Sequence, residues 1–186
     1  ESLGAFDVAV VEPGHVGASG WAHRLNPDTT VAAYVSVGEV HPGRRYFAAL
    51  RPEWKLGTNA AWGSVVGDQA PDWPAFYVDR VVKPLWEQGY RAFFLDTMDS
   101  FHLVAKTDAT RDQQVRGLAA VVRAIKSAYP EARLIFNRGF EVLPEVHTLA
   151  YAVAAESLFQ GHDAGQQKYR AVPPADREWL LGQLLK

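Results

Sequence analysis

Acidic residues follow several apolar runs in this sequence, at the points where those runs end. The clearest case is the run from Ala92 to Leu95, which is apolar throughout and leads directly into Asp96. A continuous apolar run is typical of a parallel strand that is buried on both faces. In parallel α/β folds the ligand site lies beyond the carboxyl ends of the strands, so Asp96 is predicted to face such a site.

Six carboxylates share this placement, and we expect them to converge on one face of the molecule. Glycoside hydrolysis requires two carboxyl groups about 5 to 9.5 Å apart, one protonated to serve the leaving oxygen and one ionised to attack or stabilise the anomeric carbon. Helix caps and loop hydrogen bonds also use acids at strand ends, so structural roles stay open for each one. The six residues are Glu12, Glu39, Asp96, Asp99, Glu141 and Glu156.

Asp96 and Glu156 are the strongest catalytic candidates among these acids. Glu156 ends an apolar run that begins at Leu149, and the alanines that precede it leave room around its side chain. Asp99 comes three positions after Asp96, so it points to the other side of the strand unless the strand has already ended.

Aromatic residues are the second indication of a sugar-binding protein, because pyranose rings stack on aromatic faces. The chain has 6 Trp, 7 Tyr and 9 Phe, most of which we expect in the core. Trp62 lies among small residues in a predicted loop and is the best candidate for an exposed platform. Tyr34 and Asn137, within or at the end of predicted strands, are positioned to hydrogen-bond a hydroxyl group.

Other chemistries have less support in the sequence. The six histidines show no H-E-x-x-H or similar ligand spacing, so no metal site is predicted. The absence of cysteine and of a G-x-S-x-G motif argues against nucleophilic acyl transfer. Asp96 and Asp99 superficially resemble the aspartate pair of phosphatases that use an aspartyl phosphate, but that pair has a spacing of two residues. A phosphotransfer domain therefore remains only a third interpretation.

Strands and helices alternate along the chain, which predicts an α/β fold with a parallel sheet and right-handed crossovers. Apolar positions at helical spacing predict helices over residues 71–89 and 108–129. Within the first helix Pro84 is expected to kink or divide it, and Gly89 to cap its end. Loop-rich segments over 14–20 and 58–74 are expected near the site. The predicted strands cover residues 7–11, 31–39, 91–96, 133–137 and 149–156.

Five βα units are fewer than the eight that close a barrel. No phosphate-binding loop follows any predicted strand, which disfavours an open doubly wound sheet. We therefore predict a (β/α)8 TIM-barrel type of fold that is incomplete in this chain, with residues 1–186 forming one domain.

Composition limits the partners of the protein. A formal net charge of −2, from 19 basic and 21 acidic residues spread along the chain, provides no footprint for nucleic acid or for an anionic membrane. No segment approaches the roughly 20 consecutive apolar residues of a membrane span. A chain without cysteine fits the periplasm, the exterior and the cytoplasm almost equally well.

Five ordered motifs resemble those of the PelA-type glycoside hydrolase domains of Pel polysaccharide biosynthesis, which are related to the endo-α-1,4-polygalactosaminidases. The resemblance extends over nearly the whole chain, and five motifs in order are far more specific than any one of them. The motifs are Glu12-Pro13-Gly14-His15, Ala33-Tyr34-Val35-Ser36-Val37-Gly38-Glu39, Phe94-Leu95-Asp96-Thr97-Met98-Asp99-Ser100, Phe136-Asn137-Arg138-Gly139-Phe140-Glu141 and Ala155-Glu156-Ser157.

This resemblance implies an endo-acting enzyme that cleaves α-1,4-linked, partly deacetylated N-acetylgalactosamine polymers without a metal or organic cofactor. It also implies a periplasmic or secreted location, with other Pel secretion proteins as candidate partners. By motif, Asp96 corresponds to the nucleophile and Glu156 to the general acid/base of a retaining mechanism. The residues implied to line the sugar subsites are Glu12, Tyr34, Ser36, Glu39, Trp62, Asp99, Asn137 and Glu141.

The family barrel has more strands than this sequence predicts, so we expect one barrel strand to be missing before the first strand and two after the last helix. The main alternative function is a non-catalytic module that binds an aminosugar polymer on a barrel scaffold. The presence of both Asp96 and Glu156 favours the enzyme.

Overall fold

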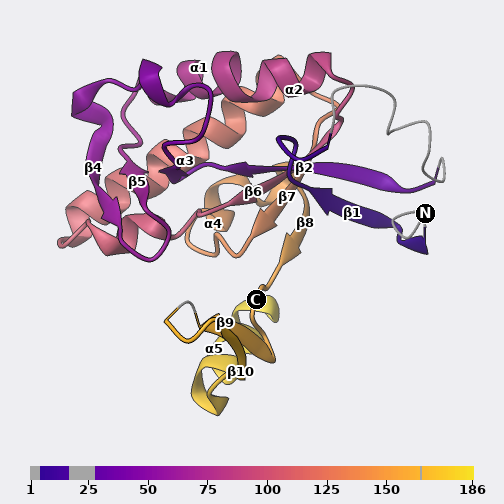
Figure 1. The fold of residues 1–186 in the computed structure, drawn as a ribbon, viewed down its shortest axis with the longest axis vertical. Coiled ribbons are helices and arrows are strands. Elements are labelled where there is room, and N and C mark those ends of the chain that lie inside the picture. The colour runs from indigo at the N-terminus through magenta and orange to yellow at the C-terminus, as the bar shows by residue number, and fades with distance from the viewer. Residues whose placement is uncertain (1–4, 17–27, 164) are drawn as a thin grey trace.

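A computed structural model describes residues 5–16, 28–163 and 165–186, and a five-stranded parallel sheet runs through its centre (Figure 1). The strand order is β1-β2-β6-β7-β8, so each new strand is added beside the previous one in chain order. All four neighbouring pairs are parallel, which confirms the predicted α/β architecture. The strands are β1 (Val8–Val11), β2 (Thr30–Ser36), β6 (Ala92–Asp96), β7 (Arg133–Asn137) and β8 (Ala150–Ala154).

The predicted helix over 71–89 is one helical segment of three parts. It consists of α1 (Trp73–Tyr77), a π-helical turn η5 (Val78–Val82) and α2 (Lys83–Glu87). Pro84 lies in the first turn of α2 and has no N–H to donate, so the regular hydrogen-bond pattern is interrupted just before it. Gly89 follows α2 with a φ of 99°, which fits the predicted cap.

The second predicted helix is α3 (Asp108–Ala128), which ends one residue earlier than expected. Thr107 caps its first turn by exchanging hydrogen bonds with Thr110. The other helices among residues 5–16, 28–163 and 165–186 are α4 (Leu143–Val146), α5 (Pro174–Leu184) and the short turns η3 (Phe47–Ala49), η4 (Pro52–Trp54), η6 (Ser100–Leu103) and η7 (His147–Leu149). Over the ranges that the structure describes, no helix is long and apolar enough to cross a membrane.

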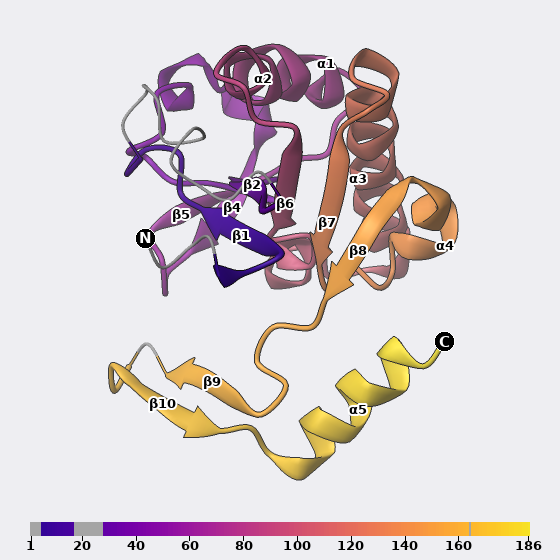
Figure 2. The ribbon, with the colours of Figure 1, turned by 90° about the vertical axis from the view of Figure 1, so that its right-hand side faces the viewer.

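The sheet has two different faces because successive strand residues point in opposite directions. One face packs against α1, α2 and α3, which lie together on one side of the sheet, and forms the main core with Phe93, Leu95 and Phe136 (Figures 1 and 2). The other face has a small cluster that includes Ala92 and Phe94. Asp96 follows these two residues at the same spacing of two, so the pleat puts it on this second face.

Three features were not predicted from the sequence. Residues 58–67 were expected in a loop, but β4 (Lys55–Asn59) and β5 (Ser64–Gly67) form a hairpin there. This hairpin pairs with β3 (Glu39–Val40), so the predicted strand 31–39 is in fact β2 followed by the start of another sheet. A second hairpin, β9 (Gln160–Asp163) and β10 (Lys168–Ala171), precedes α5. Of the loop expected over 14–20, residues 17–20 lie outside the described residues.

Candidate active site

Asp96 is the last residue of β6 and accepts hydrogen bonds from two neighbouring strands. Tyr34 Oη on β2 donates to Asp96 Oδ2 at 2.5 Å, and Asn137 Nδ2 on β7 donates to Asp96 Oδ1 at 2.7 Å. Burial and the contact with Asp96 raise the pKa of Tyr34 far above its ordinary value of 10.0. The phenol therefore stays protonated and remains a donor to the carboxylate.

Asn137 also connects Asp96 to Glu156. Its Nδ2 atom donates a second hydrogen bond, at 2.6 Å, to Glu156 Oε2 just beyond β8. Because the two bonds share one nitrogen, Asp96 Oδ1 and Glu156 Oε2 can lie no more than about 5.3 Å apart. The Asn137 side chain is nearly inaccessible to solvent, with 5% exposure, so its contacts are internal.

The backbone turns sharply after each of these three polar side chains. Thr97, Arg138 and Ser157 directly follow Asp96, Asn137 and Glu156, and their φ angles are 62°, 57° and 62°.

This left-handed conformation is uncommon for residues other than glycine, and it concentrates at functional sites. Within the described residues only one further non-glycine residue, Gln167, has a positive φ. The same left-handed turn therefore ends β6, β7 and the segment after β8. In each case the side chain just before the turn lies at the edge of the sheet. The sequence carried no signal for it, since none of the three residues is glycine or asparagine.

Ser36 and Thr97 support the turn after Asp96. Thr97 Oγ1 donates to the carbonyl of Asp96 at 2.6 Å and accepts from the amide of Gly38 at 2.9 Å. Ser36 Oγ lies 2.8 Å from Thr97 Oγ1 and donates to the carbonyl of Glu39 at 2.7 Å. The expected sugar-binding residue Ser36 thus has its described contacts within the protein.

Glu39 is likewise engaged inside the protein. It is 4% exposed, and its Oε1 atom accepts from Asn59 Nδ2 at 2.9 Å and from Ser100 Oγ at 2.6 Å. These bonds tie β3 to β4 and to the turn that follows Asp96.

Glu12 forms a bidentate ion pair with Arg44, whose Nη1 and Nη2 atoms lie 2.6 and 2.8 Å from the two carboxylate oxygens. Burial acts to raise the pKa of Glu12, but hydrogen bonds from Arg44 and the Gly14 amide outweigh it and hold the pKa below its ordinary value of 4.5. The guanidinium carbon of Arg44 also lies 5.9 Å from the centre of the Tyr34 ring. Glu12 is thereby linked to the site through Arg44 and Tyr34.

Three other predicted residues lie on exposed parts of the molecule. Asp99 Oδ2 lies 3.8 Å from Arg138 Nη1, and Glu141 Oε2 lies 2.8 Å from His102 Nε2. Trp62 is 61% exposed, as predicted for a platform. Arg138, which the sequence did not single out, also donates to the Glu156 carbonyl at 3.1 Å. Among the residues with described positions, no three His, Asp or Glu side chains are grouped so that they could hold a metal ion.

Comparisons with known proteins agree on one family. The model of glycoside-hydrolase family GH114 matches residues 2–174. The structure of the glycoside hydrolase domain of PelA from Pseudomonas aeruginosa is 40% identical, with a TM-score of 0.84 over 98% of this chain and 72% of that one. A variant of that domain gives 39% identity and a TM-score of 0.83, with the same coverage. A search of curated proteins gave no match.

Aspergillus fumigatus Ega3, solved in complex with galactosamine, shares the fold at 13% identity, with a TM-score of 0.67 over 79% of this chain and 58% of that one. The match to the PelA domain confirms the predicted TIM-barrel type of fold and the resemblance noted in the five motifs. The chain belongs to glycoside hydrolase family GH114.

Proposed function

We propose that this chain is an endo-acting hydrolase of α-1,4-linked N-acetylgalactosamine and galactosamine polysaccharide, and that it retains configuration at the cleaved sugar. The observation that carries the mechanism is the bridge from Asn137 Nδ2 to Asp96 and Glu156. Retaining glycosidases hold their two carboxyl groups about 5 to 5.5 Å apart, whereas inverting enzymes need about 6.5 to 9.5 Å to admit a water molecule. The limit set by the bridge fits the retaining class.

The hydrogen bonds also support different roles for the two acids. The Asp96 carboxylate accepts from both Tyr34 and Asn137, while the Glu156 carboxylate accepts from Asn137 and from no other side chain among the described residues. Two donors orient the Asp96 carboxylate toward the site, and one donor leaves more of the Glu156 carboxyl group available to exchange a proton with substrate or water. We therefore assign Asp96 as the nucleophile and Glu156 as the general acid/base.

The reaction follows from these roles. Glu156 gives its proton to the leaving glycosidic oxygen as Asp96 attacks the anomeric carbon and forms a covalent glycosyl-enzyme ester. Glu156, now ionised, takes a proton from a water molecule that attacks the same carbon and releases Asp96. The shared donor Asn137 keeps the Asp96 and Glu156 carboxyl groups at a fixed separation during the two steps.

The aminosugar substrate is supported by the likeness to the PelA domain and by the galactosamine in the Ega3 complex. The same likeness supports a periplasmic or secreted Pel-processing protein, with other Pel secretion proteins as partners. We assign subsite roles to Trp62, Asp99 and Glu141, which are at least partly exposed, and supporting roles to the more enclosed Ser36 and Glu39.

The test is to incubate the purified chain with the polymer and to measure new reducing ends. The wild-type chain should generate them with or without a chelator, and the Asp96→Asn variant, whose amide cannot attack as an anion, should generate none. Polymer binding without cleavage by the wild-type chain would instead indicate a binding module. Loss of activity with chelator would indicate a metal-dependent reaction.

A further inference from the structure

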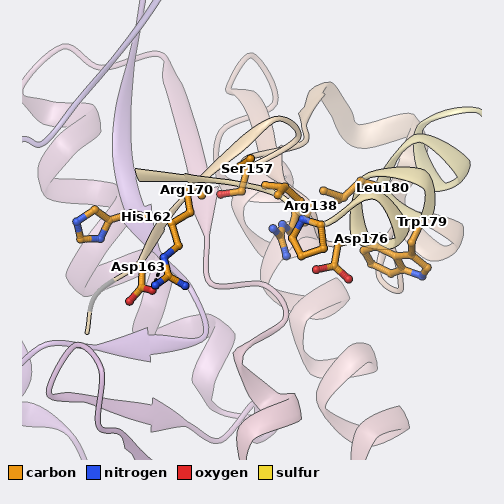
Figure 3. A pocket seen from close by; sticks show the side chains of 12 residues that line it. Arg138, Ser157, His162, Asp163, Arg170, Asp176, Trp179 and Leu180 are labelled. Carbon is orange, nitrogen blue, oxygen red and sulfur yellow. Dashed lines mark ion pairs between the residues drawn. The ribbon is translucent and has the colours of Figure 1, made fainter. Parts of the chain in front are cut away.

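A pocket of about 460 Å³ lies between the β9–β10 hairpin and α5 (Figure 3). The strands β7 and β8 point toward this region with their carboxyl ends (Figure 2). Arg138 and Ser157 line the pocket, and they directly follow Asn137 and Glu156 in the chain. The pocket is thus lined by the residues that come directly after Asn137 and Glu156, while Asn137 and Glu156 themselves do not line it. Its volume falls within the range of about 300 to 1,000 Å³ that is typical of small-molecule sites.

Trp179 on α5 provides an aromatic surface at one end of the pocket (Figure 3). Its side chain is 54% exposed, and its ring meets Phe140 edge-on at 5.9 Å between centroids. The contact with Phe140 fixes the indole while leaving part of it accessible. Such a surface suits the apolar face of a pyranose ring.

The charges around the pocket leave one carboxylate uncompensated. Arg170 pairs with Asp163 at 3.1 Å, and Arg138 pairs with Asp99 at 3.8 Å. Asp176 lines the same end of the pocket as Trp179 and has no hydrogen bond or ion pair within the described part of the chain (Figure 3). An ammonium group is the complementary partner for this carboxylate.

Aromatic rings continue from the opposite end of the pocket. His162 lines that end and stacks on Trp62, with 6.5 Å between ring centroids and 29° between planes. It also meets Tyr169 edge-on at 5.4 Å, and this tyrosine is 73% exposed. Residues from two hairpins far apart in the sequence thus form an accessible aromatic surface that adjoins the pocket, an arrangement that suits a chain of several sugar units.

We propose that the pocket between β9–β10 and α5 is a subsite for a hexosamine unit away from the scissile bond, where Trp179 stacks on the sugar ring and Asp176 binds its free amine. This inference rests on the proposed function and adds a preference for deacetylated units. The subsite would help an endo-acting enzyme to select stretches of polymer in which the unit at this distance carries an ammonium group.

The test measures binding in the inactive Asp96→Asn background, so that its result does not depend on cleavage. The probe is an α-1,4-galactosamine hexasaccharide, compared with the same hexasaccharide after chemical N-acetylation, by titration calorimetry. Replacing Trp179 by Ala should weaken binding of both probes about tenfold, as expected for loss of a stacked ring. The matched control Leu184→Ala removes another exposed apolar side chain of α5, one that does not line the pocket, and should bind like its parent.

Asp176→Asn should weaken binding of the free-amine hexasaccharide about three- to fivefold, the size expected for an exposed ion pair, and leave the N-acetylated one unchanged. Glu178→Gln, the matched loss of charge on the same helix outside the pocket, should alter neither. If the Trp179→Ala variant bound the probes as tightly as the Leu184→Ala variant, the proposed subsite would be wrong. If Asp176→Asn weakened binding of both probes equally, the proposed recognition of the free amine would be wrong. Absence of polymer cleavage by the wild-type chain would refute the proposed function separately.

Discussion

Asp96 and Glu156 share a single hydrogen-bond donor, the side-chain amide nitrogen of Asn137, at 2.7 and 2.6 Å. The sequence suggested that Asn137 binds a sugar hydroxyl. Its enclosure and its two bonds favour a different role, in which it sets the distance between the two acids. The Oδ1 atom of the same amide is buried without a partner among the described residues, so the orientation of the side chain is fixed by the two bonds from Nδ2.

Replacing Asn137 by Ala should therefore lower kcat about 100-fold with little change in KM, because misplacement of reacting groups by about 1 Å has an effect of this size. The measurement is steady-state kinetics on the polymer. Asn59→Ala is the control, since Asn59 also donates to a carboxylate, Glu39, outside the pair. A raised KM with an unchanged kcat in the Asn137→Ala variant would instead indicate that Asn137 binds a sugar hydroxyl.

Gly38 should tolerate no side chain. A Cβ atom at this position would lie 2.1 Å from the carbonyl oxygen of Thr97, in the turn that follows Asp96. We expect Gly38→Ala to lower the free energy of unfolding by about 1 to 3 kcal/mol, as overpacking does, and to reduce activity by shifting Asp96.

Thermal unfolding tests the effect of Gly38→Ala against Gly182→Ala. A Cβ atom at Gly182 in α5 would meet nothing within 4 Å. The thermal midpoint of Gly182→Ala should be unchanged or higher than that of the wild-type chain, because alanine favours a helix over glycine by about 1 kcal/mol. Equal thermal midpoints for the two variants would contradict the predicted clash.

The ion pair between Glu12 and Arg44 should make stability depend on pH. The folded-state pKa of Glu12 is lowered from 4.5, so the pair stabilises the protein above that pH and loses its contribution as the pH falls through the lower folded-state value. Glu12→Gln should unfold at a lower temperature than the wild-type chain at pH 7, and this difference should shrink below about pH 4.5.

The matched control for this prediction is Glu53→Gln, at an exposed acid without a described ion pair. Thermal midpoints measured between pH 7 and pH 3 provide the comparison. A difference between wild type and Glu12→Gln that stays constant over this range would show that the pair does not contribute in the way described.

The parallel sheet and the acids at its edge could be predicted from local sequence. Buried strands such as β6 and β7 are short apolar runs, and a polar residue directly after such a run has to lie at the end of the strand. The hairpin β9–β10 could not be predicted, because Gln160–Asp163 contains no apolar side chain and Lys168–Ala171 is exposed throughout. Its position depends on contacts with distant segments, including the ring contact between His162 and Trp62.

The sequence identified several residues of the candidate site but not the hydrogen bonds and ion pairs that connect them. Strand-end position identified Asp96, Asn137 and Glu156. The pairing of Glu12 with Arg44, 32 residues away, depends on how β1 packs beside the segment after β3, and no local pattern encodes it. The same holds for the partners of the buried Glu39, Asn59 and Ser100, which come from two different elements.

The configuration of the newly released reducing end tests the central claim most directly, because the separation of Asp96 and Glu156 determines whether the enzyme retains or inverts. Proton NMR of the polymer during the first minutes of cleavage, before the anomers equilibrate, identifies the product that forms first. The α-anomer should appear first with the wild-type chain, and Asp96→Asn should give no product. Initial release of the β-anomer would contradict the assignment of these two residues as a retaining pair.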